Sequence, residues 1–198
     1  MKTLTPIIFD MYGSLLDESI VYRNFYKYLA KKYKIKLSRG EFMRKFFQEQ
    51  RRFIFANARK SFKEITLLAL RKLIKKANAG DTNMLFDSYS AMTFHQGIPE
   101  LLQKLSKQYV LCILTNTDND LLNKINLYKK CTVKFHKIFT ADDIHVYKPN
   151  PKAYQIIVEY FQMPKDEIIY ISATDWDIEA AKKFGFDVKQ LEEIKLSY

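Results

Sequence analysis

Apolar and polar positions along the chain form blocks whose spacing predicts strands separated by helices. Short apolar runs at residues 6–9, 110–114, 137–139 and 167–171 end in polar loops and are typical of buried strands. A last short strand is predicted from Phe186 onward. Between these runs, apolar residues recur three and four positions apart, as on one face of a helix. The alternation predicts an α/β fold, a parallel sheet with helices on both faces.

One long segment between the first two predicted strands has helical spacing only. From Ile20 to about Ala77, aromatic and aliphatic residues recur three and four positions apart. Ser38 and Glu41 have the spacing of a capping box, which predicts a helix that starts there. The Gly-Asp-Thr-Asn stretch at 80–83 predicts a break between helices. The segment therefore reads as an all-helical insert.

The length of the chain fits a core that carries such an insert. A chain of 198 residues can bury one sizeable core and still supply a smaller unit. We predict that residues 1–17 and 93–198 form the α/β core and that residues 18–92 form an all-helical cap. The first apolar run is far too short for a signal peptide, and no segment is long enough to span a membrane. We therefore expect a cytoplasmic protein with no membrane partner.

The charge balance is strongly basic. The chain has 33 Lys and Arg residues against 22 Asp and Glu residues, a formal net charge of +11. Such a balance can indicate a nucleic-acid partner. The lysines, however, are scattered along amphipathic segments and form no single stripe, so we expect no nucleic-acid binding. A positive field favours a small anionic organic substrate. The sequence leaves a monomer and a homodimer both open.

Cysteine and histidine chemistry finds little support in the sequence. Cys112 and Cys131 lack the spacing of a paired metal motif, and Cys112 lies in an apolar run that predicts a buried core thiol. His95, His136 and His145 have neither metal-ligand spacing nor a nucleophile beside them. We expect no metal site built from these residues.

Polar residues gather where the predicted strands end. Asp10 follows the first strand, Thr115 and Asn116 follow the second, Lys148 lies in the loop after the third, and residues 172–177 follow the fourth. Ligands of open α/β sheets bind outside the carboxyl ends of the strands. We therefore expect these groups to meet in one site.

The same segments, in the same order, resemble the four motifs of the haloacid dehalogenase superfamily. Residues 9–17 (Phe-Asp-Met-Tyr-Gly-Ser-Leu-Leu-Asp) resemble its first motif, and residues 114–116 resemble its second. Residues 146–149 with Tyr154 are similar to the third motif, and residues 172–177 to the fourth. The resemblance spans essentially the whole chain. It implies a Rossmann-like core, with the helical insert in the position of that family's cap domain.

Two departures indicate which branch of the superfamily the chain resembles. Its phosphatases carry a second Asp two residues after the nucleophile, where this chain has Tyr12. They also hold Mg²⁺ with an Asp of the fourth motif, where this chain has Ala173. Mg²⁺ needs clustered oxygen ligands, which an alanine side chain cannot supply. The pattern resembles the metal-independent 2-haloacid dehalogenases, which implies that no cofactor is needed.

That resemblance implies a covalent mechanism. Asp10 would attack an sp³ carbon, expel halide and form an ester that water then hydrolyses. Lys148 would keep Asp10 ionised, since an ammonium at hydrogen-bond distance contributes about 4 kcal/mol at an effective dielectric near 20. Asp177 is the candidate that activates or orients the water. Ser172 and Thr174 are the remaining catalytic candidates of the fourth motif.

The resemblance also implies the residues that bind the substrate. Thr115 corresponds to a family Ser that holds the substrate carboxylate, and Asn116 to a residue near the leaving halide. Tyr12 and Tyr154 correspond to aromatic residues that line the site, and Ser14 belongs to the first motif.

The family's cap also supplies an arginine for halide and carboxylate. Arg44 is the residue that we align there, with Arg51 and Arg52 nearby on the same predicted helix.

Two other functions stay open at this point. One is a Mg²⁺-dependent phosphatase in which Asp175 replaces the missing ligand, although Tyr12 leaves it without the usual acid. The other is a non-catalytic binding protein with the same fold, which would explain Thr174 where the family usually has Asn.

Overall fold

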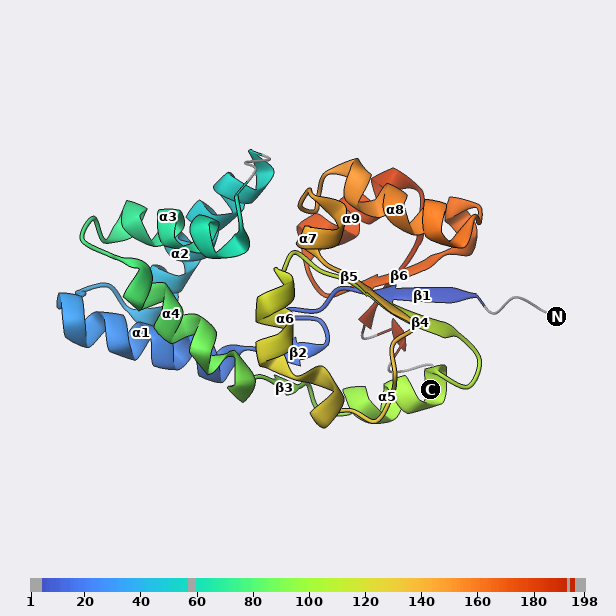
Figure 1. Ribbon diagram of the computed structural model, residues 1–198, viewed down its shortest axis with the longest axis horizontal. Coiled ribbons are helices and arrows are strands. Elements are labelled where there is room, and N and C mark those ends of the chain that lie inside the picture. The colour runs from blue at the N-terminus through green and yellow to red at the C-terminus, as the bar shows by residue number, and fades with distance from the viewer. Residues whose placement is uncertain (1–4, 57–59, 192, 195–198) are drawn as a thin grey trace.

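A computed structural model describes residues 5–56, 60–191 and 193–194 and shows one five-stranded parallel sheet in the order β5-β4-β1-β6-β7 (Figure 1). Its strands are β1 (Pro6–Phe9), β4 (Val110–Leu114), β5 (Lys137–Phe139), β6 (Ile169–Ser172) and β7 (Asp187–Gln190). The predicted strands at 6–9, 110–114 and 137–139 match β1, β4 and β5 residue for residue. The central strand is β1, which pairs with β4 and β6 on its two sides.

Both faces of the sheet are covered, as the continuous apolar strands require. Successive side chains of β1 point to opposite faces, so Ile7 and Phe9 belong to one buried cluster and Ile8 to another. Helices on opposite sides of the sheet in Figure 1 bury these clusters. They are α5 (Ile98–Leu105) and α6 (Asn119–Ile125) on the first side, and α8 (Pro151–Phe161) and α9 (Asp175–Phe184) on the second. The predicted α/β class is therefore confirmed.

The insert between β2 (Leu16–Asp17) and β3 (Thr93–Phe94) consists of helices joined by short loops in the part that the structure describes. It contains α1 (Ser19–Tyr33), α2 (Arg39–Phe55), α3 (Phe62–Leu73), α4 (Ala79–Asp87) and the 3-10 turn η1 (Ser88–Ala91). The predicted capping box of Ser38 and Glu41 starts α2. Among the described helices, we find none with the length and apolar character needed to cross a bilayer.

The predicted break at residues 80–83 is wrong, because these residues lie inside α4. The helix is capped by Asn78, whose side-chain oxygen accepts a hydrogen bond from the Gly80 amide at 2.9 Å. The Asp81 carboxylate in turn accepts one from the Asn78 amide at 2.9 Å. Gly80 and Asp81 are thus first-turn residues of a capping box, which explains their polar, turn-like composition.

A two-stranded antiparallel ribbon connects the helical segment to the sheet. It consists of β2 (Leu16–Asp17) and β3 (Thr93–Phe94), and Leu16 pairs with Phe94. The helices of the insert begin directly after β2 and end directly before β3. Because β2 follows closely after Asp10, the ribbon fixes the insert beside the carboxyl end of β1.

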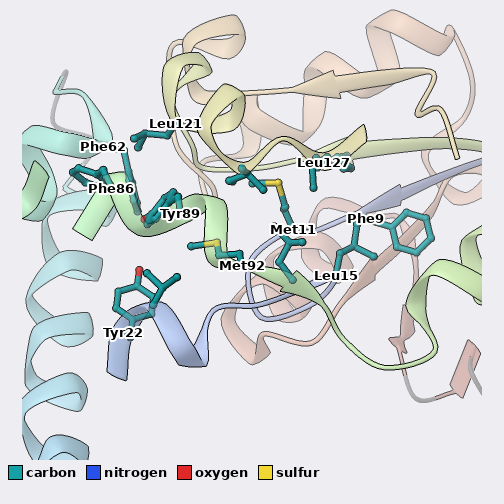
Figure 2. Packing of buried hydrophobic residues seen from close by; sticks show 14 of the residues in the cluster. Phe9, Met11, Leu15, Tyr22, Phe62, Phe86, Tyr89, Met92, Leu121 and Leu127 are labelled. Carbon is teal, nitrogen blue, oxygen red and sulfur yellow. The ribbon is translucent and has the colours of Figure 1, made fainter. Parts of the chain in front are cut away.

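Apolar packing continues from the sheet into the insert without interruption. Figure 2 shows Met11 and Met92 between the sheet and a group of aromatic side chains that includes Tyr22, Phe86 and Tyr89. Met11 and Met92 have no exposed surface. The core and the insert therefore share one hydrophobic cluster at the edge of the sheet where Asp10 lies.

The remaining helical elements are short. They are η2 (Leu127–Lys129), α7 (Ala141–Ile144) and η3 (Lys165–Glu167). We expected a loop from residue 142 onward, and α7 occupies its start because Thr140 and Asp143 form a capping box. The loop then runs to α8 and carries Lys148.

Candidate active site

Asp10 lies at the carboxyl end of the central strand, where its backbone is fixed by the neighbouring strand. Its amide donates to the carbonyl of Ile171 at 2.9 Å. The turn that follows uses Gly13 at φ +72°, a left-handed conformation that a glycine adopts at little cost. This turn brings the Ser14 hydroxyl back to donate to Asp10 Oδ2 at 2.8 Å. Asp10 is only 8% exposed.

Lys148 faces the other oxygen of this carboxylate. Its Nζ donates to Asp10 Oδ1 at 2.8 Å, to Asp177 Oδ2 at 2.8 Å and to the Tyr170 hydroxyl at 3.0 Å. The side chain of Asn116 forms hydrogen bonds with both the amide and the carbonyl of Lys148. Asn116 Oδ1 accepts from the Lys148 amide at 2.7 Å, and Asn116 Nδ2 donates to its carbonyl at 2.9 Å. The loop lysine is thus fixed in place with all three of its ammonium protons used.

Asp177 is fully buried beneath Lys148, in the first turn of α9. Its Oδ1 accepts from the Tyr154 hydroxyl at 2.7 Å, and its Oδ2 accepts from both Lys148 and the Tyr170 hydroxyl at 2.8 Å. Both oxygens therefore point into the protein. Asp177 can hold Lys148 in position, but in this arrangement it has no contact with the cavity above Asp10.

The electrostatics of this cluster support an ion pair. Burial raises the pKa of Asp10 above its ordinary value, and the positive charge of Lys148 offsets only part of this rise. Burial alone would lower the pKa of Lys148, but the charges of Asp10 and Asp177 outweigh it and raise that pKa. Lys148 therefore stays protonated at neutral pH, between two carboxylates.

A cavity of about 240 Å³ opens over Asp10, between the sheet edge and the insert. The sheet side contributes Asp10, Tyr12, Asn116, Lys148, Thr174 and Trp176. The insert contributes Glu18, Tyr22, Phe47, Gln50, Arg51, Ile54 and Phe62. This volume is below the range of about 300–1,000 Å³ that is typical of sites for drug-sized ligands. The cavity fits a molecule of a few heavy atoms with an apolar part and an anionic group.

Several predicted site residues meet at this cavity. Tyr12 lines it and shares a hydrogen bond of 2.8 Å with Thr117 Oγ1. Asn116 and Thr174 line it as well. Thr174 caps α9, and its amide donates to Ser172 Oγ at 3.1 Å. Ser172 itself is buried, so it supports the loop that carries Thr174.

Ser14, Thr115 and Tyr154 are near these groups but do not line the cavity. Ser14 is buried under Asp10, and its Oγ also accepts from the Ala173 amide at 2.9 Å, which ties the first motif to the fourth. Thr115 is buried, and its Oγ1 has no hydrogen-bond partner among the described residues. Tyr154 packs in the same buried cluster as Ile8, and its hydroxyl donates to Asp177 Oδ1 at 2.7 Å.

The structure brings Arg51 to the cavity, and not Arg44. Both lie on α2, and Arg44 is exposed and does not line the cavity. Seven helical residues place Arg51 on nearly the same side of α2 but about 10 Å further along its axis. Since a helix presents several arginines on one side, only the packing of α2 against the core determines which one reaches the site.

Glu18 is a cavity residue that sequence reasoning missed. Burial, followed by the negative charges of Asp10 and Asp17, raises its pKa to about 8. Among the described residues, its carboxyl has no hydrogen-bond partner. In the sequence, Glu18 has the appearance of an ordinary acidic residue before a helix, and no spacing distinguishes it.

The oxygen donors at the site do not fit Mg²⁺. The ammonium of Lys148 occupies the position between Asp10 and Asp177 where a shared cation would bind. Ala173 offers no side-chain oxygen, and Asp175 is exposed. In the part of the chain that the structure describes, no three His, Cys, Asp or Glu side chains are grouped to hold a metal.

Comparison with known proteins gives a consistent result. (S)-2-haloacid dehalogenase 4A of Burkholderia cepacia is 27% identical over 194 residues, 96% of this chain and 84% of that protein. A solved dehalogenase with an intermediate complex is 25% identical, with a TM-score of 0.74, over 95% of this chain and 84% of that chain.

A third match shows the same fold. L-2-haloacid dehalogenase from Xanthobacter autotrophicus, with chloropropionic acid covalently bound, has a TM-score of 0.73 at 22% identity, over 94% of this chain and 76% of that chain. The profile of the family described as haloacid dehalogenase-like hydrolase matches residues 7–190. The chain is therefore a hydrolase that belongs to the haloacid dehalogenase-like family.

Proposed function

We propose that this hydrolase removes halide from a small 2-haloalkanoic acid through a covalent ester on Asp10, without a metal. The observation that carries the proposal is the pair at the floor of the cavity. The carboxylate of Asp10 faces the cavity, and its counter-charge is the buried ammonium of Lys148 at 2.8 Å. A carboxylate kept ionised by a protein cation can act as a nucleophile and form a covalent ester.

In the first step, one carboxylate oxygen of Asp10 attacks the carbon that bears the halogen, from the side opposite the halogen. The carbon–halogen bond breaks, halide leaves with the electron pair, and an ester joins Asp10 to the substrate. Lys148 keeps Asp10 ionised before the attack, and Ser14 holds the carboxylate in a fixed orientation. Such fixed geometry lowers the barrier by supplying the orientation in advance.

The lining of the cavity supports a small anionic substrate. Arg51 supplies a cation from the insert that can hold the substrate carboxylate. Phe47, Ile54 and Trp176 supply apolar surface for a short alkyl group. The relative from Burkholderia cepacia named above is an (S)-2-haloacid dehalogenase, so we propose (S)-2-chloropropionate as a substrate.

In the second step, water attacks the carbonyl carbon of the Asp10 ester, and the bond from that carbon to the substrate oxygen breaks. The product is a 2-hydroxy acid, and the Asp10 carboxylate is restored. The first step inverts the substrate carbon and the second does not touch it. An (S)-2-haloacid should therefore give the (R)-2-hydroxy acid.

The test combines two assays with one variant. The protein is incubated with (S)-2-chloropropionate in EDTA, and in parallel with p-nitrophenyl phosphate and Mg²⁺. We expect chloride release that survives EDTA and is absent in Asp10→Asn. Phosphate release that requires Mg²⁺ would instead establish the phosphatase, and no turnover in either assay, over a broad substrate panel, would favour a binding protein.

A single turnover in H₂¹⁸O tests the covalent step directly. Because water attacks the carbonyl carbon of Asp10, the label should appear first in the peptide that contains Asp10. Label found first in the hydroxy acid would show direct attack of water on the substrate and would overturn the ester.

A further inference from the structure

Asp118 lies at the start of α6, two residues after the second motif, and its side chain does not cap that helix. An aspartate in this position normally accepts hydrogen bonds from the first amides of its own helix. Here the carboxylate of Asp118 accepts none of them, and the Asn119 amide donates to Asp142 Oδ2 at 2.7 Å instead. Asp118 is only 5% exposed, so its carboxylate needs hydrogen-bond donors from another part of the chain.

Both oxygens of Asp118 accept hydrogen bonds from the start of α3, a helix of the insert. Oδ1 accepts from the Phe62 amide at 3.0 Å, and Oδ2 accepts from the Lys63 amide at 3.4 Å. The positive end of the α3 dipole also favours a carboxylate at this place. A carboxylate of the core thus caps a helix of the insert.

This cap satisfies two amides that α3 cannot satisfy alone. The first four amides of a helix have no partner inside it. In α3, the capping box satisfies two of them, because the Ser61 amide donates to the Glu64 carboxylate at 2.9 Å and the Glu64 amide donates to Ser61 Oγ at 3.2 Å. The other two amides belong to Phe62 and Lys63, and Asp118 accepts a hydrogen bond from each. The start of α3 is therefore fully bonded only while it lies against the core.

The first residue held by this carboxylate belongs to the wall of the active-site cavity. Phe62 lines the cavity, and its ring packs against that of Phe86 with the ring centroids 6.5 Å apart (Figure 2). Hydrogen bonds connect Phe62 to a second wall residue. The Phe62 carbonyl accepts from Thr66 Oγ1 at 2.7 Å, and Thr66 Oγ1 accepts from Gln50 Nε2 at 2.9 Å. Gln50 also lines the cavity, so the position of α3 determines where both wall residues lie.

We propose that Asp118 is a positioning residue of the active site, which caps α3 and thereby holds the insert closed with Phe62 and Gln50 in the cavity wall. This inference rests on the proposed function. Asp118 does not line the cavity, so it acts through α3 and not on the substrate. A site between two units has to open to admit substrate and close before the reaction. The two hydrogen bonds to Asp118 favour the closed arrangement, because they exist only while α3 lies against the core.

Loss of this cap should affect substrate binding and leave the chemical steps unchanged. Substrate binds productively to the closed arrangement, and its apparent affinity falls with the fraction of the protein in that arrangement. Once the insert has closed on the substrate, Asp10 and Lys148 have the same geometry as in the parent protein. KM should therefore rise while kcat stays the same.

The kinetic experiment compares Asp118→Ala with Asp120→Ala. In Asp118→Ala we expect KM for (S)-2-chloropropionate to rise by about ten-fold or more, while kcat stays within about two-fold of the parent protein. Asp120 is the matched control, because it forms an ion pair with the side chain of the same insert residue, Lys63, at the surface. Exposed ion pairs contribute little, so Asp120→Ala should keep both constants within about two-fold. Asp118→Asn retains one acceptor oxygen and should give a KM between those of the parent and Asp118→Ala.

Hydrogen exchange followed by mass spectrometry tests the contact without any turnover. The peptide that contains Phe62 and Lys63 should exchange about ten-fold faster in Asp118→Ala than in the parent protein. The start of α2 is the internal reference, because its capping box of Ser38 and Glu41 lies within the insert. Its peptide should exchange at the same rate in both proteins.

Three results would overturn the role of Asp118. An unchanged KM in a folded Asp118→Ala would show that the cap serves stability alone. A lower kcat at unchanged KM would show that the residue acts on the chemical steps. Unchanged exchange at the start of α3 would show that the cap does not hold this helix. If the parent protein releases no chloride, the proposed function fails, while the exchange comparison still tests the cap.

A second variant replaces Asp118→Ala if that protein does not fold. The Tyr147 hydroxyl donates to the Lys60 carbonyl at 2.8 Å, directly before the capping box of α3. Tyr147→Phe removes only this bond between the core and the start of α3, so KM should rise by about two- to ten-fold at unchanged kcat. A KM equal to that of the parent in both Tyr147→Phe and Asp118→Asn would overturn the inference.

Discussion

Nζ of Lys148 lies 2.8 Å from Oδ2 of Asp177, a carboxylate that does not line the cavity over Asp10. The cation that faces Asp10 is thus held by a second carboxylate with no exposed surface. Two carboxylates share this one buried ammonium, so both lose their counter-charge if Lys148 is removed. Removing one member of such a set leaves an uncompensated buried charge, which costs more than the set contributes as a whole.

Lys148→Met should abolish turnover and lower the free energy of unfolding by about 3–5 kcal/mol, because Asp10 and Asp177 are left buried without a cation. Urea unfolding monitored by circular dichroism measures the loss. Adding Asp177→Asn to this variant should restore much of the stability but none of the activity. A single variant as stable as the parent would show that the two carboxylates are not compensated by Lys148.

Arg51→Met should raise KM for (S)-2-chloropropionate by about ten- to a hundred-fold, the range expected for loss of a hydrogen bond to a charged group. Arg44→Met is the matched control on the same helix and should stay within about two-fold of the parent. Steady-state chloride release gives both constants. The reverse pattern would place Arg44 at the substrate and would require α2 to move along its axis.

Ser14→Ala should lower kcat by about ten-fold or more with little change in KM, since Ser14 orients Asp10 from below and has no exposed surface. Ser106→Ala, an exposed serine bonded to the Gln103 carbonyl, should leave both constants unchanged. A rise in KM with normal kcat would mean that Ser14 contacts the substrate, as we expected from the sequence.

Glu18→Gln should gain stability relative to the parent as the pH rises. The folded pKa of Glu18 is about 8, above its ordinary value of 4.5, so the folded state holds a proton that the unfolded state has lost. Between these two pH values, the parent's free energy of unfolding therefore falls with increasing pH through this group. The glutamine variant lacks this decline. Urea unfolding from pH 5 to pH 9 checks it, and parallel curves for the two proteins would contradict the raised pKa.

Helices and strands could be predicted where they depend on residues that are close together in the sequence. The strand at 110–114 was predicted to the residue, and its end followed from the polar residues Thr115 and Asn116 after the apolar run. The start of α2 followed from Ser38 and Glu41. The error at 80–83 arose because a capping box and a turn use the same residue types. Which of the two forms depends on the apolar contacts of the residues that follow.

The candidate site was accessible only in part. Asp10 and Lys148 could be selected because each follows a strand, directly or after a short segment, and the carboxyl ends of parallel strands lie together. Asp177 could be selected only through the resemblance of residues 172–177 to the family's fourth motif. The insert side could not be predicted in this way. Glu18 and Arg51 reach the cavity through the packing of the insert on the core, a set of contacts between segments far apart in the sequence. No local spacing encodes those contacts.

Because two carboxylates share one ammonium, the site can form only in a certain order during protein synthesis. A ribosome delivers Asp10 among the first residues of the chain, Lys148 much later, and Asp177 later still. Until α9 has left the ribosomal tunnel, Lys148 cannot acquire the second partner that holds it. The cluster of Asp10, Lys148 and Asp177 is therefore completed only after residue 177 has left the ribosome, later than the first strands and the whole insert.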